Sequence, residues 1–303
     1  MKPINQKGKG VIYSATGKKF IDEAIVSANS LKKHNKGIKI TIFVDKKEYL
    51  KNYTYLFHSI YEIKHPEYSF GDKIYALKHT PYEKSLFLDT DTIITDDISE
   101  VFKILDVFDM AAANVSYNYH SYPHFNTGVI LFSMNSSVLD FIDFWNHIFN
   151  RKTENHDQGA FQRALAKKSI NFFTLPPNYN FRVRFASYVR GKIKIIHYHH
   201  LHMNPVERLK FIAYLNTSLK ERVWFPRKNL IINFKEKSNI IVKFLHYLER
   251  TFLNRIQFWD FLSKRKLFHY ILISPFPWLI NWVIPLDYRE KMFNVHKKIK
   301  KLN

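Results

Sequence analysis

Two aspartates separated by one residue end an apolar run in the first third of the chain. The run covers residues 86–88, and Asp89 and Asp91 follow it. Burying unpaired carboxylates is costly, so a pair at the end of a buried strand needs a compensating charge. A divalent cation supplies one, because Mg²⁺ and Mn²⁺ prefer hard oxygen ligands and also bridge phosphate groups. The pattern indicates a metal site, although two aspartates can also simply cap a turn.

Six further short motifs accompany the acidic pair in a fixed order along the chain. They are Val11-Ile12-Tyr13-Ser14-Ala15, Asp72-Lys73-Ile74-Tyr75, Phe125-Asn126-Thr127-Gly128-Val129, His156-Asp157-Gln158-Gly159, Leu175-Pro176-Pro177-Asn178-Tyr179-Asn180 and Ile195-Ile196-His197-Tyr198. With Leu88-Asp89-Thr90-Asp91-Thr92, their order resembles glycosyltransferase family 8 over about residues 8–203. That family has the GT-A fold and includes glycogenin and sugar transferases of bacterial lipopolysaccharide biosynthesis. Each motif is short, so the resemblance depends on their order and spacing.

The resemblance implies a metal site and a nucleotide site. The metal, Mn²⁺ or Mg²⁺, would be held by Asp89, Asp91 and His197. The nucleotide pocket, usually for a uridine base, would be lined by the end of the first strand, at Tyr13, Ser14 and Ala15. Lys73 would contact the phosphate or the sugar of the donor.

The resemblance also implies the reaction. The chain would move a hexose from a nucleotide-diphosphate sugar, UDP-linked in most of the family, to a glycan or lipid-linked acceptor with retention of configuration. Asn126 would face the donor sugar, and Asp157 and Gln158 would lie beside the anomeric carbon. From the residues alone, Asn126 could instead be a turn residue, and Asp157 could cap the helix that follows it.

The chain departs from the family after the metal histidine. The family commonly has a glycine three residues later and then a lysine that grips the diphosphate. Here His200 takes the glycine's place, and Met203 lies near the lysine position. The phosphate contact must therefore come from another cation, such as Lys73, Arg182 or Arg184.

The elements that must position these residues alternate between strand and helix. Strands are predicted at residues 10–15, 38–44, 85–88, 108–113, 128–132 and 193–197, the last of them ending the sheet. Apolar periodicity predicts helices over residues 20–31, around 75–77, over 138–150 and over 157–167. This alternation is typical of an α/β fold, and we expect a GT-A-type open, mostly parallel sheet flanked by helices. We expect a catalytic domain over residues 1–204.

The remaining residues, 205–303, are predicted to form a basic, aromatic and mainly helical region. Residues 204–303 carry 20 Lys and Arg against 7 Asp and Glu. Residues 267–286 are apolar over about the length of a membrane span, but Pro275, Pro277 and Pro285 interrupt them. We therefore expect an interfacial or packed segment that docks on a membrane or an acceptor, and no spanning helix.

Bulk composition leaves other function classes open. The formal net charge is +21, which implies a polyanionic partner. A non-catalytic nucleic-acid-binding protein would fit this charge, but no nucleic-acid motif is present and such a protein has no need of the acidic pair. A sugar nucleotidyltransferase would be expected to carry more glycine after the first strand. With no cysteine and no signal-peptide pattern at the N-terminus, we expect a cytoplasmic protein, peripheral on the cytoplasmic membrane face.

The basic, aromatic region predicts salt-sensitive binding to anionic membranes. Each Lys or Arg near an anionic surface contributes on the order of 1 kcal/mol, and this attraction is screened by salt. In vesicle flotation at low salt, the full chain should bind anionic vesicles, ignore neutral ones and be released at high salt. Failure to bind anionic vesicles at low salt would rule out membrane docking.

Overall fold

The computed structural model describes residues 8–114, 125–198, 203–226 and 229–233. All of them belong to one compact unit, residues 1–238, and a second unit over residues 239–303 lies outside the described residues. Of residues 205–303, the basic region predicted to dock on a membrane, only 205–226 and 229–233 are among the described residues. No helix within these described ranges is long and apolar enough to cross a membrane.

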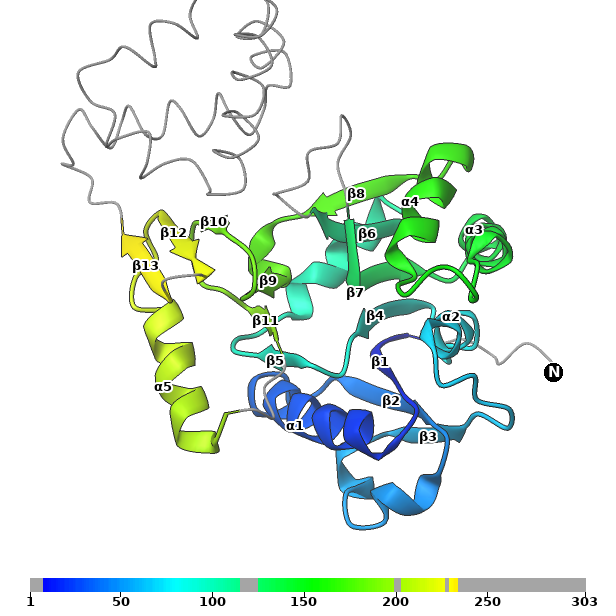
Figure 1. Ribbon diagram of the computed structural model, residues 1–303, viewed down its shortest axis with the longest axis horizontal. Helices are drawn as coiled ribbons and strands as arrows, with labels where there is room; N and C mark the ends of the chain where they lie inside the picture. The colour runs from blue at the N-terminus through cyan, green and yellow to red at the C-terminus, as the bar shows by residue number, and fades with distance from the viewer. Residues whose placement is uncertain (1–7, 115–124, 199–202, 227–228, 234–303) are drawn as a thin grey trace, which may run out of the picture. The chain divides into compact units, whose positions relative to one another are not determined.

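The α-helices of the described chain are interspersed among its strands (Figure 1). The α-helices are α1 (Lys18–His34), α2 (Phe70–Lys78), α3 (Ser136–Ile148), α4 (Gln158–Lys167) and α5 (Pro205–Leu215). The strands are β1 (Lys9–Ala15), β2 (Lys39–Val44), β3 (Ser59–Glu62), β4 (Lys84–Leu88), β5 (Thr92–Ile94), β6 (Met110–Asn114), β7 (Phe125–Ser133), β8 (Phe172–Leu175), β9 (Phe181–Arg182), β10 (Ser187–Val189), β11 (Ile195–His197), β12 (Arg222–Phe225) and β13 (Leu230–Asn233). Short 3-10 helices lie at η1 (Lys47–Leu50), η2 (Thr54–Leu56), η3 (Ser99–Asp106) and η4 (Pro177–Tyr179).

Seven strands form the central sheet, in the order β3-β2-β1-β4-β7-β6-β8. The pairs β2–β3, β1–β2, β1–β4 and β6–β8 are parallel, and only β7 runs antiparallel to its two neighbours. The open, mostly parallel sheet predicted from the sequence is confirmed, and five of the expected strands take their places in it as β1, β2, β4, β6 and β7.

Helices cover both faces of this sheet. Strand β1 shows why: Tyr13 and Ala15 enter one buried cluster with α1 and η3, whereas Ile12 enters another with α2, α3 and α4. Side chains alternate between the two faces of a strand, so a strand that is apolar throughout must be covered twice. Figure 1 shows α2, α3 and α4 gathered on the side of the sheet away from α1.

Two small three-stranded sheets follow the central one. Their orders are β5-β11-β9 and β10-β12-β13. They share a buried cluster that includes Phe181, Ile196, Leu215 and Trp224, so α5, β12 and β13 pack with the strands before them. The predicted boundary at residue 204 stays a prediction.

The last predicted strand belongs to a different sheet from the one expected. Residues 195–197 form β11, which pairs antiparallel with β5 and parallel with β9. The last strand of the central sheet is β8, at Phe172–Leu175. The expectation was wrong because a short apolar run shows that a strand is buried but does not identify its partner. The correction matters because β11 carries His197.

Candidate active site

The acidic pair and the Asn126 motif meet because β4 and β7 are antiparallel neighbours. Strand β4 ends with Leu88 opposite Val129, in the middle of β7. The ladder continues one residue further, since the backbone N–H of Asp89 donates to the carbonyl of Gly128 at 2.8 Å. Segments about 40 residues apart in sequence therefore lie side by side at the carboxyl end of β4, where open parallel sheets bind their ligands.

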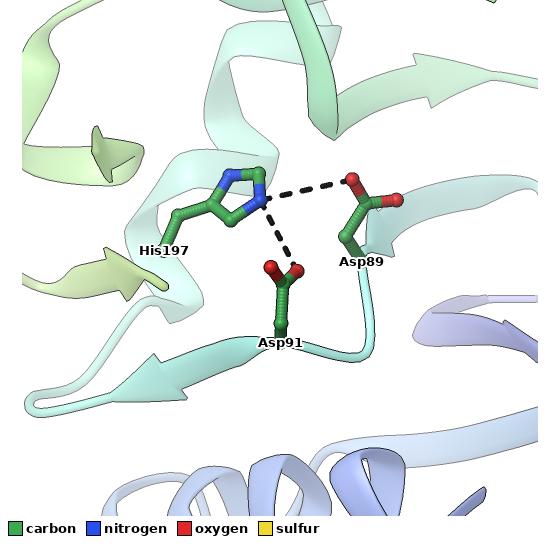
Figure 2. Close-up of side chains that lie close together, drawn as sticks. All are labelled: Asp89, Asp91 and His197. Atoms are coloured by element: carbon green, nitrogen blue, oxygen red, sulfur yellow. Dashed lines mark ion pairs between the residues drawn. The ribbon is translucent and has the colours of Figure 1, made fainter. Parts of the chain in front are cut away.

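Asp89, Asp91 and His197 form one cluster. Strands β5 and β11 pair with Thr92 opposite His197. This register brings the imidazole beside the acidic loop, the three residues 89–91 between β4 and β5. Figure 2 shows the three side chains pointing toward one another. Nε2 of His197 lies 3.1 Å from Oδ1 of Asp91 and 3.8 Å from Oδ2 of Asp89. All three side chains are partly exposed, so a ligand can reach them.

The geometry and the donor set suit a small divalent cation. One potential ligand atom from each residue lies within 4.8 Å of the others. Neighbouring ligands around an octahedral ion with bonds of ~2.1 Å lie about 3 Å apart, which is close to the spacing observed here. Two carboxylates suit Mg²⁺ or Mn²⁺, and a cation would also compensate their charge. The residues predicted to bind a metal are thus brought together, and metal binding itself remains a proposal.

Gly128 makes room for this cluster. A Cβ atom at this position would lie 2.2 Å from Cε1 of His197 and 2.7 Å from Oδ2 of Asp89. Such contacts are far inside van der Waals distance, so any larger residue would displace the imidazole or the carboxylate. The glycine of the Asn126 motif is therefore explained by close packing.

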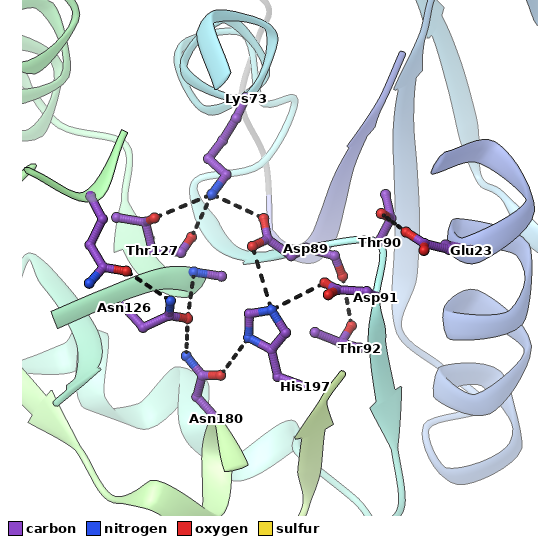
Figure 3. Close-up of polar contacts among 12 residues, drawn as sticks. Glu23, Lys73, Asp89, Thr90, Asp91, Thr92, Asn126, Thr127, Asn180 and His197 are labelled. Carbon is purple, nitrogen blue, oxygen red and sulfur yellow. Dashed lines mark hydrogen bonds and ion pairs between the residues drawn. The ribbon is translucent and has the colours of Figure 1, made fainter. Parts of the chain in front are cut away.

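Lys73 is buried beside the acidic pair (Figure 3). Its ammonium lies 3.0 Å from Oδ1 of Asp89 and 3.4 Å from Oδ2 of Asp157, and it donates to the carbonyl of Thr127 at 3.1 Å. Burial alone lowers the pKa of Lys73, but the carboxylates of Asp157 and Asp89 outweigh burial and raise that pKa above its ordinary value. The group stays charged as the partner of two protein carboxylates, and the contact with the donor predicted for Lys73 stays a prediction.

Asp157 is almost fully buried as well. Its Oδ1 accepts a hydrogen bond from the Thr127 hydroxyl at 3.0 Å, and its Oδ2 faces Lys73. It precedes α4 but makes no side-chain capping bond, so the capping alternative is wrong. The carboxylate is thus held behind Lys73, and a direct contact with the anomeric carbon stays a prediction.

Asn126 and Gln158 are joined by a side-chain hydrogen bond, and their predicted contacts with the donor sugar stay a prediction. Asn126 is nearly buried at the start of β7, and its Nδ2 donates to Oε1 of Gln158 at 3.0 Å. Its Oδ1 accepts from the backbone N–H of Gly128 at 3.0 Å and from Nδ2 of Asn180 at 2.8 Å. Asn180 belongs to a motif in the sequence but received no role there. It also reaches His197, with its Oδ1 2.9 Å from Nδ1 of the imidazole.

The first-strand residues divide between the core and the strand end. Tyr13 is fully buried, and its hydroxyl lies 2.9 Å from that of Ser27. Burial raises the pKa of Tyr13, and the Ser27 hydrogen bond opposes this only in part. The predicted nucleotide contact of Tyr13 therefore cannot come from its side chain. Ala15 is buried and Ser14 partly exposed at the carboxyl end of β1.

Helix α1 anchors the acidic loop from its buried face, which the sequence analysis missed. Glu23 accepts a hydrogen bond from the Thr90 hydroxyl at 2.9 Å. Ser27 lies 2.9 Å from the Thr92 hydroxyl, which donates to the carbonyl of Asp89 at 2.8 Å. The signal was available, since Glu23 and Ser27 are four residues apart and therefore share one helix face with the apolar residues.

The two arginines considered for phosphate contact differ in position. Arg182 lies opposite His197 in the β9–β11 pairing, and paired residues of neighbouring strands face the same side of a sheet. Its guanidinium also lies 4.2 Å from the ring centroid of Phe185. Arg184 is exposed beyond the end of β9. Of the two, Arg182 is the one that the fold places next to the cluster.

Comparison with known proteins identifies the class. The model of the nucleotide-diphospho-sugar transferase family matches residues 84–235, which is half of the chain and includes the acidic pair and His197. The model of the Rhodobacterales glycosyltransferase domain matches residues 12–119. The chain belongs to the nucleotide-diphospho-sugar transferase family. It is thus a glycosyltransferase by class, and its sheet is the GT-A-type arrangement expected from the sequence.

Solved structures with a similar chain path are also glycosyltransferases by name. GlyE of Streptococcus pneumoniae is 18% identical with a TM-score of 0.48, and the match covers 76% of this chain and 56% of GlyE. Mouse xyloside xylosyltransferase 1 is 13% identical with a TM-score of 0.44, over 65% of this chain and 100% of that one. The galactosyltransferase LgtC is 13% identical with a TM-score of 0.41, and the match covers 58% of this chain and 76% of LgtC. No curated protein matches the sequence.

Removing the Lys73 charge should destabilise the fold. Lys73→Met leaves two carboxylates without their cation, and breaking a buried pair in this way costs about 3–5 kcal/mol. Chemical denaturation measures this as a lower free energy of unfolding. Lys78→Met on the same helix is the control, because the Lys78–Asp143 pair is exposed and worth about 0–1 kcal/mol. Equal effects of the two substitutions would contradict the role given to Lys73.

Adding one methyl group at Gly128 should disrupt the cluster of Asp89, Asp91 and His197. Gly128→Ala forces His197 or Asp89 out of place, so Mn²⁺ affinity measured by calorimetry should fall by more than about tenfold. Gly37→Ala is the control, since a Cβ there meets nothing within 4 Å. Wild-type Mn²⁺ affinity in Gly128→Ala would show that the cluster does not hold the metal as described.

Proposed function

We propose that this chain is a metal-dependent hexosyltransferase of the family 8 type. The donor is a nucleotide-diphosphate sugar, UDP-linked, and the sugar passes to a glycan or lipid-linked acceptor with retention of configuration. The observation that carries the proposal is the convergence of Asp89, Asp91 and His197 within ligand distance of one another at the carboxyl end of the central sheet. Membership in the nucleotide-diphospho-sugar transferase family supports the donor class.

The metal ligands would be Asp89, Asp91 and His197, with Mn²⁺ or Mg²⁺ as the ion. When bound, such an ion neutralises the negative charge that develops on a departing diphosphate. Lys73 keeps Asp89 in place from behind, and its charge balances a carboxylate that would otherwise repel the phosphates. Arg182, beside His197 on the neighbouring strand, is our candidate for the cation that replaces the family's missing lysine.

The sugar side of the site would be formed by Asn126 and Gln158. Since Oε1 of Gln158 accepts from Asn126, its amide nitrogen is left to donate to a ligand, and the residue is partly exposed. Fixed amide dipoles of this kind orient a sugar without reorganisation during the reaction. Ser14 and Ala15, at the end of β1, remain our candidates for the nucleotide pocket. We expect Asp157 to act through Lys73 and Thr127.

The acceptor and the cellular location are proposed from sequence alone. The charge and aromatic content of residues 205–303 favour a phosphorylated or lipid-linked glycan beside an anionic membrane on the cytoplasmic side. A role in lipopolysaccharide biosynthesis would fit such an acceptor.

Donor hydrolysis by the purified protein tests the proposed function. Across UDP-, GDP- and CMP-sugars with Mn²⁺, UDP-sugars should be hydrolysed fastest, and chelator should abolish hydrolysis until Mn²⁺ is restored. Asp91→Asn should lower the rate at least ~100-fold, because metal charge stabilisation is worth several kcal/mol. Asp97→Asn is the matched control, since Asp97 is exposed and its carboxylate accepts hydrogen bonds from the backbone N–H and the hydroxyl of Ser99. Full activity in excess chelator would overturn the metal assignment.

A further inference from the structure

A chain of amide side chains runs from a backbone N–H to the imidazole of His197. It begins at Gly128, whose backbone N–H lies 3.0 Å from one atom of the Asn126 side-chain amide. A backbone N–H can only donate, so that atom must be the oxygen Oδ1. The orientation of the Asn126 amide is therefore fixed by the backbone of its own strand.

The next side chain takes its orientation from Asn126. The same Oδ1 lies 2.8 Å from the Asn180 amide, and since an oxygen acceptor needs a donor, the Asn180 atom facing it is Nδ2. The other end of the Asn180 amide, its oxygen, then lies 2.9 Å from Nδ1 of His197. An amide oxygen can only accept, so Nδ1 must carry a proton (Figure 3).

The position of the proton determines whether Nε2 of His197 presents a lone pair or an N–H to the side of the ring where Asp89 and Asp91 lie. In the neutral imidazole only one nitrogen is protonated, so a proton held on Nδ1 leaves the Nε2 lone pair for a metal ion, whereas without a metal the carboxylate of Asp91 competes for that proton at Nε2. Nε2 is the atom that faces Asp91 at 3.1 Å and Asp89 at 3.8 Å. In the opposite tautomer, an Nε2–H would point at the carboxylates and form a hydrogen bond to Asp91 in place of a metal bond.

Burial keeps this chain of hydrogen bonds intact. Asn180 is 5% exposed and Asn126 7% exposed, so water cannot readily take over these hydrogen bonds. Asn180 directly precedes β9, and the pairing of β9 with β11 sets its place next to His197. The ring itself packs against Gly128. This glycine therefore both donates the first hydrogen bond of the chain and leaves the space that the imidazole occupies.

We infer that Asn180 is a positioning residue, which holds His197 in the tautomer with the proton on Nδ1 and the Nε2 lone pair toward Asp89 and Asp91. This inference rests on the metal site of the proposed function. Histidines that bind metals donate their other ring N–H to a partner, and loss of that partner costs about 10–100-fold in metal affinity.

Mn²⁺ binding by the full chain tests this role, with a matched pair of asparagines. Asn180→Ala should raise the Mn²⁺ dissociation constant about 10–100-fold. Asn178→Ala is the control, because the Nδ2 of Asn178 donates at 2.8 Å to the carbonyls of Arg190 and Lys192 and not to His197. Asn178→Ala should lower the melting temperature and leave Mn²⁺ affinity unchanged. Equal Mn²⁺ affinity in Asn180→Ala and the wild type would overturn the inference.

A spectroscopic measurement reads the tautomer without any metal. In ¹⁵N-histidine-labelled protein at alkaline pH, where imidazoles are neutral, the His197 signals are assigned by their loss in His197→Gln. The wild type should show a larger share of the tautomer with the proton on Nδ1 than Asn180→Ala does, because in the variant only Asp91 still accepts the imidazole proton, at Nε2. Equal tautomer populations in the two proteins would overturn the inference. If the wild type binds no Mn²⁺, the proposed metal site is wrong, and the spectrum still decides what Asn180 does.

Discussion

The buried ammonium group of Lys73 is the interaction on which the rest of the site depends. It comes from α2 and contacts Asp89 after β4, Thr127 on β7 and Asp157 before α4. A buried charge is tolerated only when it is paired, so these four segments cannot separate without exposing uncompensated charges. The acidic pair can therefore stay open to a ligand while one of its members is fixed from behind. The ion pair matters less for net stability than for placing Asp89 in one position.

How far the sequence predicts this site depends on whether the information is local. The strand end that carries Asp89 and Asp91 is visible in the sequence, because an apolar run followed by two acids is a local pattern. The depth of a side chain is not local. Tyr13 and Lys73 lie in recognisable motifs, yet one is packed beneath α1 and the other between two carboxylates. Motif membership predicted that these residues matter, and only the fold shows that their side chains support the site from within.

Strand partners are the second kind of information that the sequence lacks. His197 was predicted as a ligand from its motif, but its strand was assigned to the central sheet, whereas it pairs with β5. Asn180 was quoted in a motif and given no role, because its contact with His197 exists only once β9 and β11 are paired. By contrast, Glu23 could have been found, since a glutamate on the apolar face of a predicted helix demands a partner. That partner is Thr90, between the two aspartates.

The register between β5 and β11 joins these observations. Side chains alternate along a strand, so a slip of one residue would turn His197 away and bring Ile196 toward the acidic loop. Thr92, opposite His197, donates its only hydroxyl proton to the carbonyl of Asp89 and therefore accepts from Ser27. Ser27 in turn must accept from the hydroxyl of Tyr13. The buried tyrosine of the first strand thus begins a directed hydrogen-bond chain that ends at the carbonyl of Asp89, and this is a physical reason for a polar group at that depth in the core.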